Sequence, residues 1–260
     1  MNKRAILALM LAIVLPLAGY FIVSYYSKTA APMPGHYFYD DVKEINEHGK
    51  LTTDTVWHVV RDIKFTTQMG KQVNLYDLHN RILVIDFFFT RCGSICPAMT
   101  LAMKKLQDSY RKTDTLVQFI SISVDPVHDS VPHLRKWADR FNVNHDNWWF
   151  VTGDKKDIYD FALTELKAGL ADTEVDSAFI HTPLMFLVDT THHVRGFYDG
   201  LDSAKQTQLV RDISLLSLEK DKKAPTIFRD FIPILPIIFI GIGIIVIMSV
   251  IFTRKKRKDG

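Results

Sequence analysis

The sequence contains only two cysteines, Cys92 and Cys96, which lie four positions apart. At this spacing two sulfur atoms can turn to the same side, close enough to form a disulfide or to bind one metal ion. Thiolate is the reactive form in both cases, since it is the nucleophile in disulfide exchange and a soft metal ligand. The pair indicates redox chemistry, metal binding or a structural disulfide, although a disulfide across so short a loop restrains the unfolded chain little.

The residues around the pair predict a strand followed directly by a helix. Residues 82–89 are a run of apolar and aromatic side chains interrupted only by Asp86, as in a strand that is buried on both faces. A helix is expected from Pro97, whose missing N–H costs nothing at a first helical position, to about residue 110. The N-terminal end of a helix carries partial positive charge and free N–H groups, which favour thiolate over thiol.

Two further side chains are candidates to act with the cysteines. His181 directly precedes Thr182-Pro183 and a predicted strand at residues 184–188, and it is either a metal ligand or a structural or surface residue. Asp86 lies within a predicted buried strand, six positions before Cys92. If Asp86 is buried without a partner, its pKa is raised and it suits a proton acceptor for a thiol; otherwise it lies at the strand edge or binds backbone N–H groups.

Three other features have a structural interpretation. Met99 and Met103 are four positions apart on the cysteine helix and are expected to pack in the core rather than to bind metal. Asp125-Pro126 is expected to end a strand and begin a turn. His192 and His193 are adjacent in a predicted hairpin turn, so they should point to opposite faces, and we expect both at the surface.

Strand and helix patterns alternate between residues 56 and 219, which predicts one α/β domain whose sheet is closed by a hairpin. The expected strands are residues 56–63, 82–89, 116–124, 148–151, 184–188 and 193–198, with an additional hairpin that turns at Gly70. The other expected helices are residues 130–141, 155–166 and 203–219, the last capped by Ser203. Residues 27–55 and 220–230 lack apolar periodicity and are expected to be linkers.

Two uncharged apolar stretches flank this domain. Residues 5–26 and 231–253 are each long enough to cross a membrane as a helix, at about 1.5 Å rise per residue. Residues 1–26 are therefore expected to be an anchor, or alternatively a cleaved signal peptide. Basic residues precede the first stretch and form the tail 254–260, so the positive-inside rule places both ends in the cytoplasm. The domain then faces the periplasm of a bacterial inner membrane.

The charge balance argues against nucleic acid as a partner. The whole chain has a formal net charge of +3, from 32 basic and 29 acidic residues. Seven of the basic residues flank the predicted spans, which leaves 25 basic and 28 acidic residues between them, a net charge of −3. The basic character therefore belongs to the predicted cytoplasmic flanks, and the domain itself is not basic.

Three stretches of the chain carry a resemblance to a known family. The sequences FFFTRCGSICPAMT at residues 87–100, SISVDP at 121–126 and FIHTPLMFLVD at 179–189 resemble the Sco/SenC family, over roughly residues 56–218. These are membrane-anchored copper-binding proteins of cytochrome oxidase assembly with a thioredoxin-like fold. The resemblance implies that Cys92, Cys96 and His181 bind one copper ion.

The chemistry of this ligand set agrees with copper. Two thiolates and an imidazole suit Cu(I) and are acceptable for Cu(II), whereas structural zinc normally takes a fourth protein ligand. The sequence departs from the family pattern in its second predicted span. It departs again in the Thr-Pro after His181, which is more like the proline loop of thioredoxin-type oxidoreductases.

The resemblance implies a copper metallochaperone rather than an enzyme. It would deliver copper from a periplasmic copper donor to the dinuclear copper site of cytochrome c oxidase, with the copper-bearing subunit of that enzyme as its partner. The alternative is a membrane-anchored thiol–disulfide oxidoreductase that reduces cysteines of a target protein through a redox-active Cys92–Cys96 disulfide. A peroxidase is a third candidate, but nothing in the sequence specifies a peroxide pocket.

Overall fold

The computed structural model describes residues 14, 17–22, 25, 32–47, 50–110, 116–168 and 183–219. The chain divides into two units, one made of Met1–Pro32 with Lys220–Gly260 and the other of Met33–Glu219. In the first unit, residues 17–22 are helical. Both predicted spans and the basic tail lie largely or wholly outside the described residues. Within the described ranges, no helix is long and apolar enough to cross a membrane.

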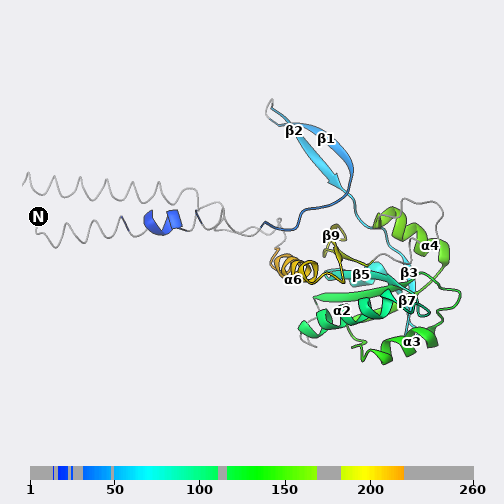
Figure 1. Ribbon diagram of the computed structural model, residues 1–260. Helices are drawn as coiled ribbons and strands as arrows, with labels where there is room; N and C mark the ends of the chain where they lie inside the picture. The colour runs from blue at the N-terminus through cyan, green and yellow to red at the C-terminus, as the bar shows by residue number, and fades with distance from the viewer. Residues whose placement is uncertain are drawn as a thin grey trace, which may run out of the picture. The chain divides into compact units, whose positions relative to one another are not determined.

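The second unit is built on a seven-stranded mixed sheet (Figure 1) with the strand order β4-β3-β7-β6-β5-β8-β9. Its central strands β5, β6 and β7 run parallel, and β3 and β4 on one side and β8 and β9 on the other are antiparallel additions. The strands are β3 (Lys64–Thr67), β4 (Gln72–Asn74), β5 (Ile82–Phe88), β6 (Val117–Ser123), β7 (Trp148–Thr152), β8 (Leu184–Val188) and β9 (Val194–Asp199).

Helices cover both faces of the sheet, which gives the predicted α/β domain. One face packs against α2 (Ile95–Ser109), α3 (Val131–Arg140) and α6 (Ser203–Ser217). The other face packs against the short 3-10 helix η1 (Leu75–Leu78), α4 (Lys155–Asp160) and the π-helical turn η2 (Phe161–Glu165) that continues α4. Because β5 and β6 are covered on both sides, almost every side chain in them is buried.

The structure corrects our prediction that residues 27–55 are an irregular linker. β1 (Tyr39–Glu47) and β2 (Lys50–Trp57) form an antiparallel ribbon in which Tyr39 pairs with Trp57 (Figure 1). Val42, Ile45 and Leu51 of the ribbon are exposed. A ribbon that buries neither face shows no alternation of apolar and polar residues, so the usual strand pattern is missing from its sequence.

Several element boundaries also differ from the prediction. The strand expected at residues 56–63 ends at Trp57, and only Val59 pairs further, as a single bridge to His193. The cap of α6 is Asp202, whose carboxylate accepts the backbone N–H of Ala204, rather than Ser203. The other strands and helices start and end within about three residues of their expected positions, and the turn at Gly70 has the positive φ that favours glycine.

Candidate metal and thiol site

The two cysteines lie in the loop and first turn that join β5 to α2, as predicted. The Cys92 backbone N–H donates to the Phe89 carbonyl over 3.2 Å, which folds the loop back after the strand. The backbone N–H of Cys96 donates to Sγ of Cys92 over 3.4 Å, and the Ser94 hydroxyl lies 3.9 Å from the same sulfur. Both thiols are free and buried. The Cys92 sulfur therefore occupies the anion-favouring end of α2.

The two thiols differ in acidity. Burial raises the pKa of Cys92, but hydrogen bonds from the Cys96 thiol and from the backbone N–H groups of Cys96 and Ser94 outweigh burial and hold the pKa below its usual value. Burial raises the pKa of Cys96 far above its usual value, and its hydrogen bond to Cys92 adds to this effect. Cys92 is thus the residue that ionises first, and Cys96 retains its proton.

Asp86 lies in the middle of the sheet rather than at its edge. It belongs to β5, between β6 and β8, and it pairs with Ser121 across the parallel ladder. Its side chain is buried, and Oδ1 has no hydrogen-bond partner among the described residues. Burial raises its pKa to about 7, against the lowering effect of a hydrogen bond with Ser121. Its charge also contributes to the raised pKa of Cys96, so the carboxyl acts on the cysteine pair.

A second aspartate, which we did not predict, fixes the loop before Cys92. Asp129 is fully buried and accepts the backbone N–H of Thr90 at 3.0 Å and the Thr90 hydroxyl at 2.5 Å. It also accepts the Ser123 hydroxyl at 2.5 Å, so one carboxylate joins the cysteine loop to the end of β6. Its only sequence signal is an acidic residue shortly after the predicted Asp125-Pro126 turn, which did not distinguish it from a surface residue.

Asp125 follows the end of β6, as expected, but it also contacts the residue next to Cys92. The Arg91 guanidinium donates to Oδ2 of Asp125, with Nη2 at 2.5 Å, and Nδ1 of His128 lies 2.8 Å from Oδ1. Burial opposes ionisation, but the hydrogen bonds with His128 and Arg91 outweigh it, so the pKa of Asp125 is lowered. These contacts join the residue before Cys92 to the turn that follows β6.

The third predicted ligand, His181, lies outside the described residues, together with Thr182 and the polar connection at residues 169–177. The described chain resumes at Pro183, whose carbonyl accepts the Gly200 N–H over 2.7 Å. β8 then runs antiparallel to β5, with Ile85 opposite Phe186. This register brings the start of β8 to the end of the sheet where β5 leads into the cysteine loop.

The remaining candidates are resolved by burial. Met99 and Met103 are buried in the core beneath α2, as expected. The surface position expected for His192 is wrong, because its side chain is buried against the ring of Tyr76, with centroids 4.5 Å apart. His193 is only partly exposed and faces the other way. Both histidines of the β8–β9 turn are therefore in contact with segments that lie far away in the sequence.

Comparisons with known proteins identify the family. A family profile described as SCO1/SenC matches residues 52–216. A protein described as an SCO1 homolog from Bacillus subtilis is 33% identical over 173 residues, which is 66% of this chain and 90% of that protein.

Solved structures give the same result. BsSco, studied for a disulfide switch and described as a member of the Sco family of cytochrome c oxidase assembly proteins, is 34% identical with a TM-score of 0.55, over 64% of this chain and 98% of that one. A SCO1/SenC family lipoprotein from Bacillus anthracis is 31% identical with a TM-score of 0.54, over 62% and 95%. Yeast Sco1, solved with copper bound, shares the fold at 16% identity and a TM-score of 0.50, over 64% and 92%. This chain belongs to the SCO1/SenC family.

Proposed function

We propose that this protein binds copper through Cys92, Cys96 and His181 and delivers it to the dinuclear copper site of cytochrome c oxidase. The observation that carries the proposal is the arrangement of the two cysteines. Both thiols are free, and Cys92 sits at the helix terminus with a lowered pKa, which favours the thiolate that a soft metal binds. Copper binding to Cys92 also lowers the energetic cost of ionising the Cys96 thiol.

The register of β8 supports His181 as the third ligand. The described chain resumes two residues after this histidine's position, at Pro183, and β8 starts at the same end of the sheet as the cysteine loop. Two residues of extended chain span about 7 Å, so the chain at position 181 stays close to Pro183 and to this end of the sheet. Three protein ligands leave copper open to a fourth ligand from a partner, which allows release by ligand exchange.

Copper is the cargo in this account, and the family supports that role. Yeast Sco1, which shares the fold, was solved with copper bound, and BsSco is described as a cytochrome c oxidase assembly protein. The partner of this chain would then be the copper-bearing subunit of the oxidase, and a periplasmic copper donor would load it. Oxidation of Cys92 and Cys96 to a disulfide removes both thiolates, so loading depends on the reduced form.

The test measures copper and thiols on the same full-length protein, purified in detergent and reduced without oxygen. We expect about one copper ion per chain in the reduced protein and none in the disulfide form or in Cys92→Ser. The matched control is Ser94→Ala, which alters the same loop but removes no proposed ligand. Full copper binding by Cys92→Ser would contradict the proposal.

A second function is favoured by the difference between the two thiols. A more acidic Cys92 beside a less acidic Cys96 is the arrangement of a dithiol reductant, in which Cys92 attacks a target disulfide and Cys96 then resolves the mixed disulfide. This activity needs both cysteines and tolerates loss of His181. Oxidase assembly in cells that carry His181→Ala separates the two functions: assembly fails if copper delivery is essential and persists if thiol reduction is sufficient.

We also propose that residues 5–26 and 231–253 are two membrane spans and that the domain faces the periplasm. Their length and lack of charge support the spans, and the basic residues at both ends support the orientation. Cysteine labelling with a membrane-impermeant maleimide tests the topology. In a Cys92→Ser/Cys96→Ser protein, a new cysteine at Lys43 should react from the periplasmic side, and one at Lys256 should not.

A further inference from the structure

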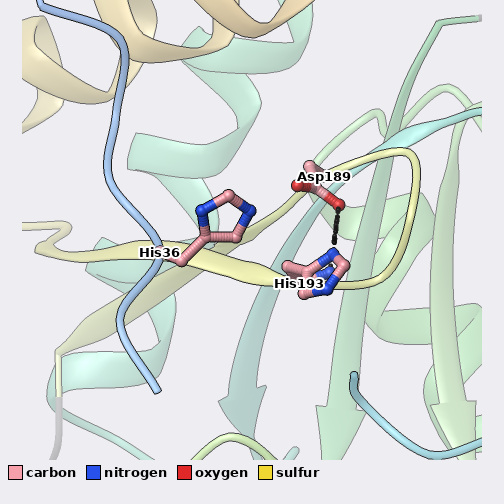
Figure 2. Close-up of side chains that lie close together, drawn as sticks. All are labelled: His36, Asp189 and His193. Carbon is pink, nitrogen blue, oxygen red and sulfur yellow. Dashed lines mark hydrogen bonds and ion pairs between the residues drawn. The ribbon is translucent and has the colours of Figure 1, made fainter. Parts of the chain in front are cut away.

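A second group of metal-binding side chains lies in the described part of the domain, at His36, Asp189 and His193. One nitrogen of each imidazole and one carboxylate oxygen all lie within 4.8 Å of one another (Figure 2). We propose that these three residues bind a divalent transition-metal ion of borderline softness, such as Zn²⁺ or Cu²⁺. This site does not depend on the cysteines or on the proposed delivery of copper.

The turn between β8 and β9 positions two of the ligands. The Asp189 backbone N–H donates to the His193 carbonyl over 3.0 Å, and His192 N–H donates to the Asp189 carbonyl over 3.0 Å. His192 adopts a positive φ of 64°, which turns the chain sharply so that the next residue returns toward Asp189. As a result, Nδ1 of His193 lies 3.7 Å from Oδ1 of Asp189.

The third ligand comes from the segment that precedes β1, more than 150 residues away in the sequence. Two contacts hold this segment on either side of His36: the Pro34 carbonyl accepts the Arg195 guanidinium, and the Tyr37 N–H donates to the Val194 carbonyl over 3.1 Å. The His36 ring stacks on Trp57 with centroids 4.9 Å apart and meets the His193 ring nearly edge-on. Figure 2 shows the His36 ring beside the side chains of Asp189 and His193.

The donor set fits a borderline divalent ion. Two imidazoles and a carboxylate suit Zn²⁺ and Cu²⁺, whereas Cu(I) prefers sulfur. Zinc–ligand distances of about 2.0–2.2 Å place tetrahedral ligand atoms about 3.3–3.6 Å apart, close to the 3.7 Å between His193 and Asp189. Burial, together with the positive charge of Arg195, lowers the pKa of His36, which is compatible with a neutral imidazole at this position.

The surroundings of the carboxylate are those of a supported ligand. Asp189 is buried, and its Oδ2 accepts the Arg195 guanidinium at 2.8 Å, while Oδ1 accepts the backbone N–H groups of Thr191 and His193. The Thr191 hydroxyl lies 2.8 Å from Oδ1 and 2.9 Å from Nδ1 of His193, so a metal that bound both atoms would replace this hydroxyl as their shared partner. Glu219 binds the same guanidinium and offsets its charge.

The site is separate from the cysteine pair. β8 runs antiparallel to β5, so the β8–β9 turn lies beside the start of β5, where Val188 pairs with Leu83. Cys92 follows the other end of β5, beyond Phe88. The two groups therefore lie at opposite ends of the same strand, which at about 3.3 Å per residue places them well beyond the reach of one ion.

The test uses the full-length protein with Cys92→Ser and Cys96→Ser, so that neither thiol can bind the probe, and His181 is present in every variant. Zn²⁺ is titrated by calorimetry, and Co²⁺ is added as a spectroscopic probe of ligand geometry. We expect saturable binding of about one Zn²⁺ per chain, a metal-dependent rise in melting temperature, and the strong visible absorption of four-coordinate Co²⁺. His36→Gln and His193→Gln should each weaken zinc binding at least tenfold, since even loss of a supporting contact costs about that much.

The matched controls are His79→Gln and His133→Gln, which remove exposed histidines elsewhere in the domain and should leave zinc affinity within about twofold. Melting temperatures measured without metal verify that each variant folds. The proposal is overturned if the background protein shows no saturable zinc binding, or if His36→Gln and His193→Gln bind zinc as the controls do. It is equally overturned if zinc raises the melting temperature of the His193→Gln protein as much as that of the background protein.

Discussion

The backbone N–H of Cys96, in the first turn of α2, donates to Sγ of Cys92 in the loop that precedes this helix. This hydrogen bond helps to lower the pKa of Cys92, whereas burial raises the pKa of Cys96. The end of the helix that favours a thiolate at Cys92 leaves Cys96 buried, and the charge of Asp86 adds to the raised pKa of Cys96. The domain therefore holds two buried thiols, of which Cys92 is the more acidic and Cys96 the less acidic.

This difference predicts an order of modification in the reduced, metal-free protein. Because the pKa of Cys92 is lowered and that of Cys96 is raised, iodoacetamide should modify Cys92 first at pH 7. Peptide mass spectrometry after short labelling identifies the modified residue. In the Cys92→Ser control, Cys96 should remain largely unmodified over the same time. Faster labelling of Cys96 in the unsubstituted protein would show that the assignment of the thiolate is reversed.

Asp86 predicts a specific dependence of stability on pH. Its pKa is about 7 in the folded protein and close to 3.8 when unfolded, so the folded state binds the extra proton between these values. The contribution of Asp86 to stability is full below pH 3.8 and is lost as the pH rises to about 7. Asp86→Asn, which cannot ionise, should therefore gain about 2 kcal/mol relative to the unsubstituted protein between pH 5 and pH 8.

Urea unfolding of the reduced protein at the two pH values measures this gain. Asp62→Asn is a suitable control, because Asp62 is exposed and should show no such change. An equal difference between Asp86→Asn and the unsubstituted protein at pH 5 and pH 8 would mean that the carboxyl does not titrate in this range.

Asp129 predicts a large loss of stability on truncation. Asp129→Ala leaves the Thr90 N–H, the Thr90 hydroxyl and the Ser123 hydroxyl without their buried acceptor. Unpaired buried donors cost about 1–3 kcal/mol each, so we expect the free energy of unfolding to fall by about 3 kcal/mol. Denaturant unfolding measures the change, with Asp146→Ala at an exposed position as the control. A loss below about 1 kcal/mol would show that this carboxylate does not hold the loop.

We expect the loss of Arg195 to lower the free energy of unfolding, and a second substitution should partly reverse this effect. Its buried guanidinium pairs with Asp189 and Glu219 and binds the Pro34 carbonyl. Arg195→Met leaves the buried carboxylate of Asp189 without its partner, which we expect to cost about 3–5 kcal/mol. Adding Asp189→Asn removes that charge and should recover part of the loss, as a double-mutant cycle of unfolding free energies would show. Strictly additive losses would indicate that the pair does not interact.

The sequence predicted those strands and helices that bury at least one face, because burial leaves a pattern of apolar residues. β5 and β6 are apolar runs because both faces are covered, and the cysteine loop follows from the break in that run. The ribbon of β1 and β2 was not predictable in the same way, since Val42 and Leu51 are exposed and its sequence lacks a period. Asp202 and Ser203 are both good helix caps, so the sequence does not decide which of them caps α6, and the backbone geometry does.

The candidate sites show the same limit. The positions of Cys92 and Cys96 followed from local pattern, because they lie close together in sequence at the end of one strand. The burial of His192 and the approach of His36 to His193 depend on contacts between segments that are distant in sequence. Asp129 looks like any acidic turn residue until the fold brings Thr90 to it. Such long-range pairings carry no periodicity that a single sequence displays.

The most direct test of the copper account is X-ray absorption at the copper edge on the reduced, copper-loaded full-length protein. We expect scattering from two sulfur atoms and one imidazole bound to copper. The imidazole contribution should disappear in His181→Ala but persist in the His79→Ala control. An unchanged spectrum in His181→Ala, with copper affinity within about twofold of the unsubstituted protein, would contradict the three-residue ligand set and leave a dithiol oxidoreductase as the better description.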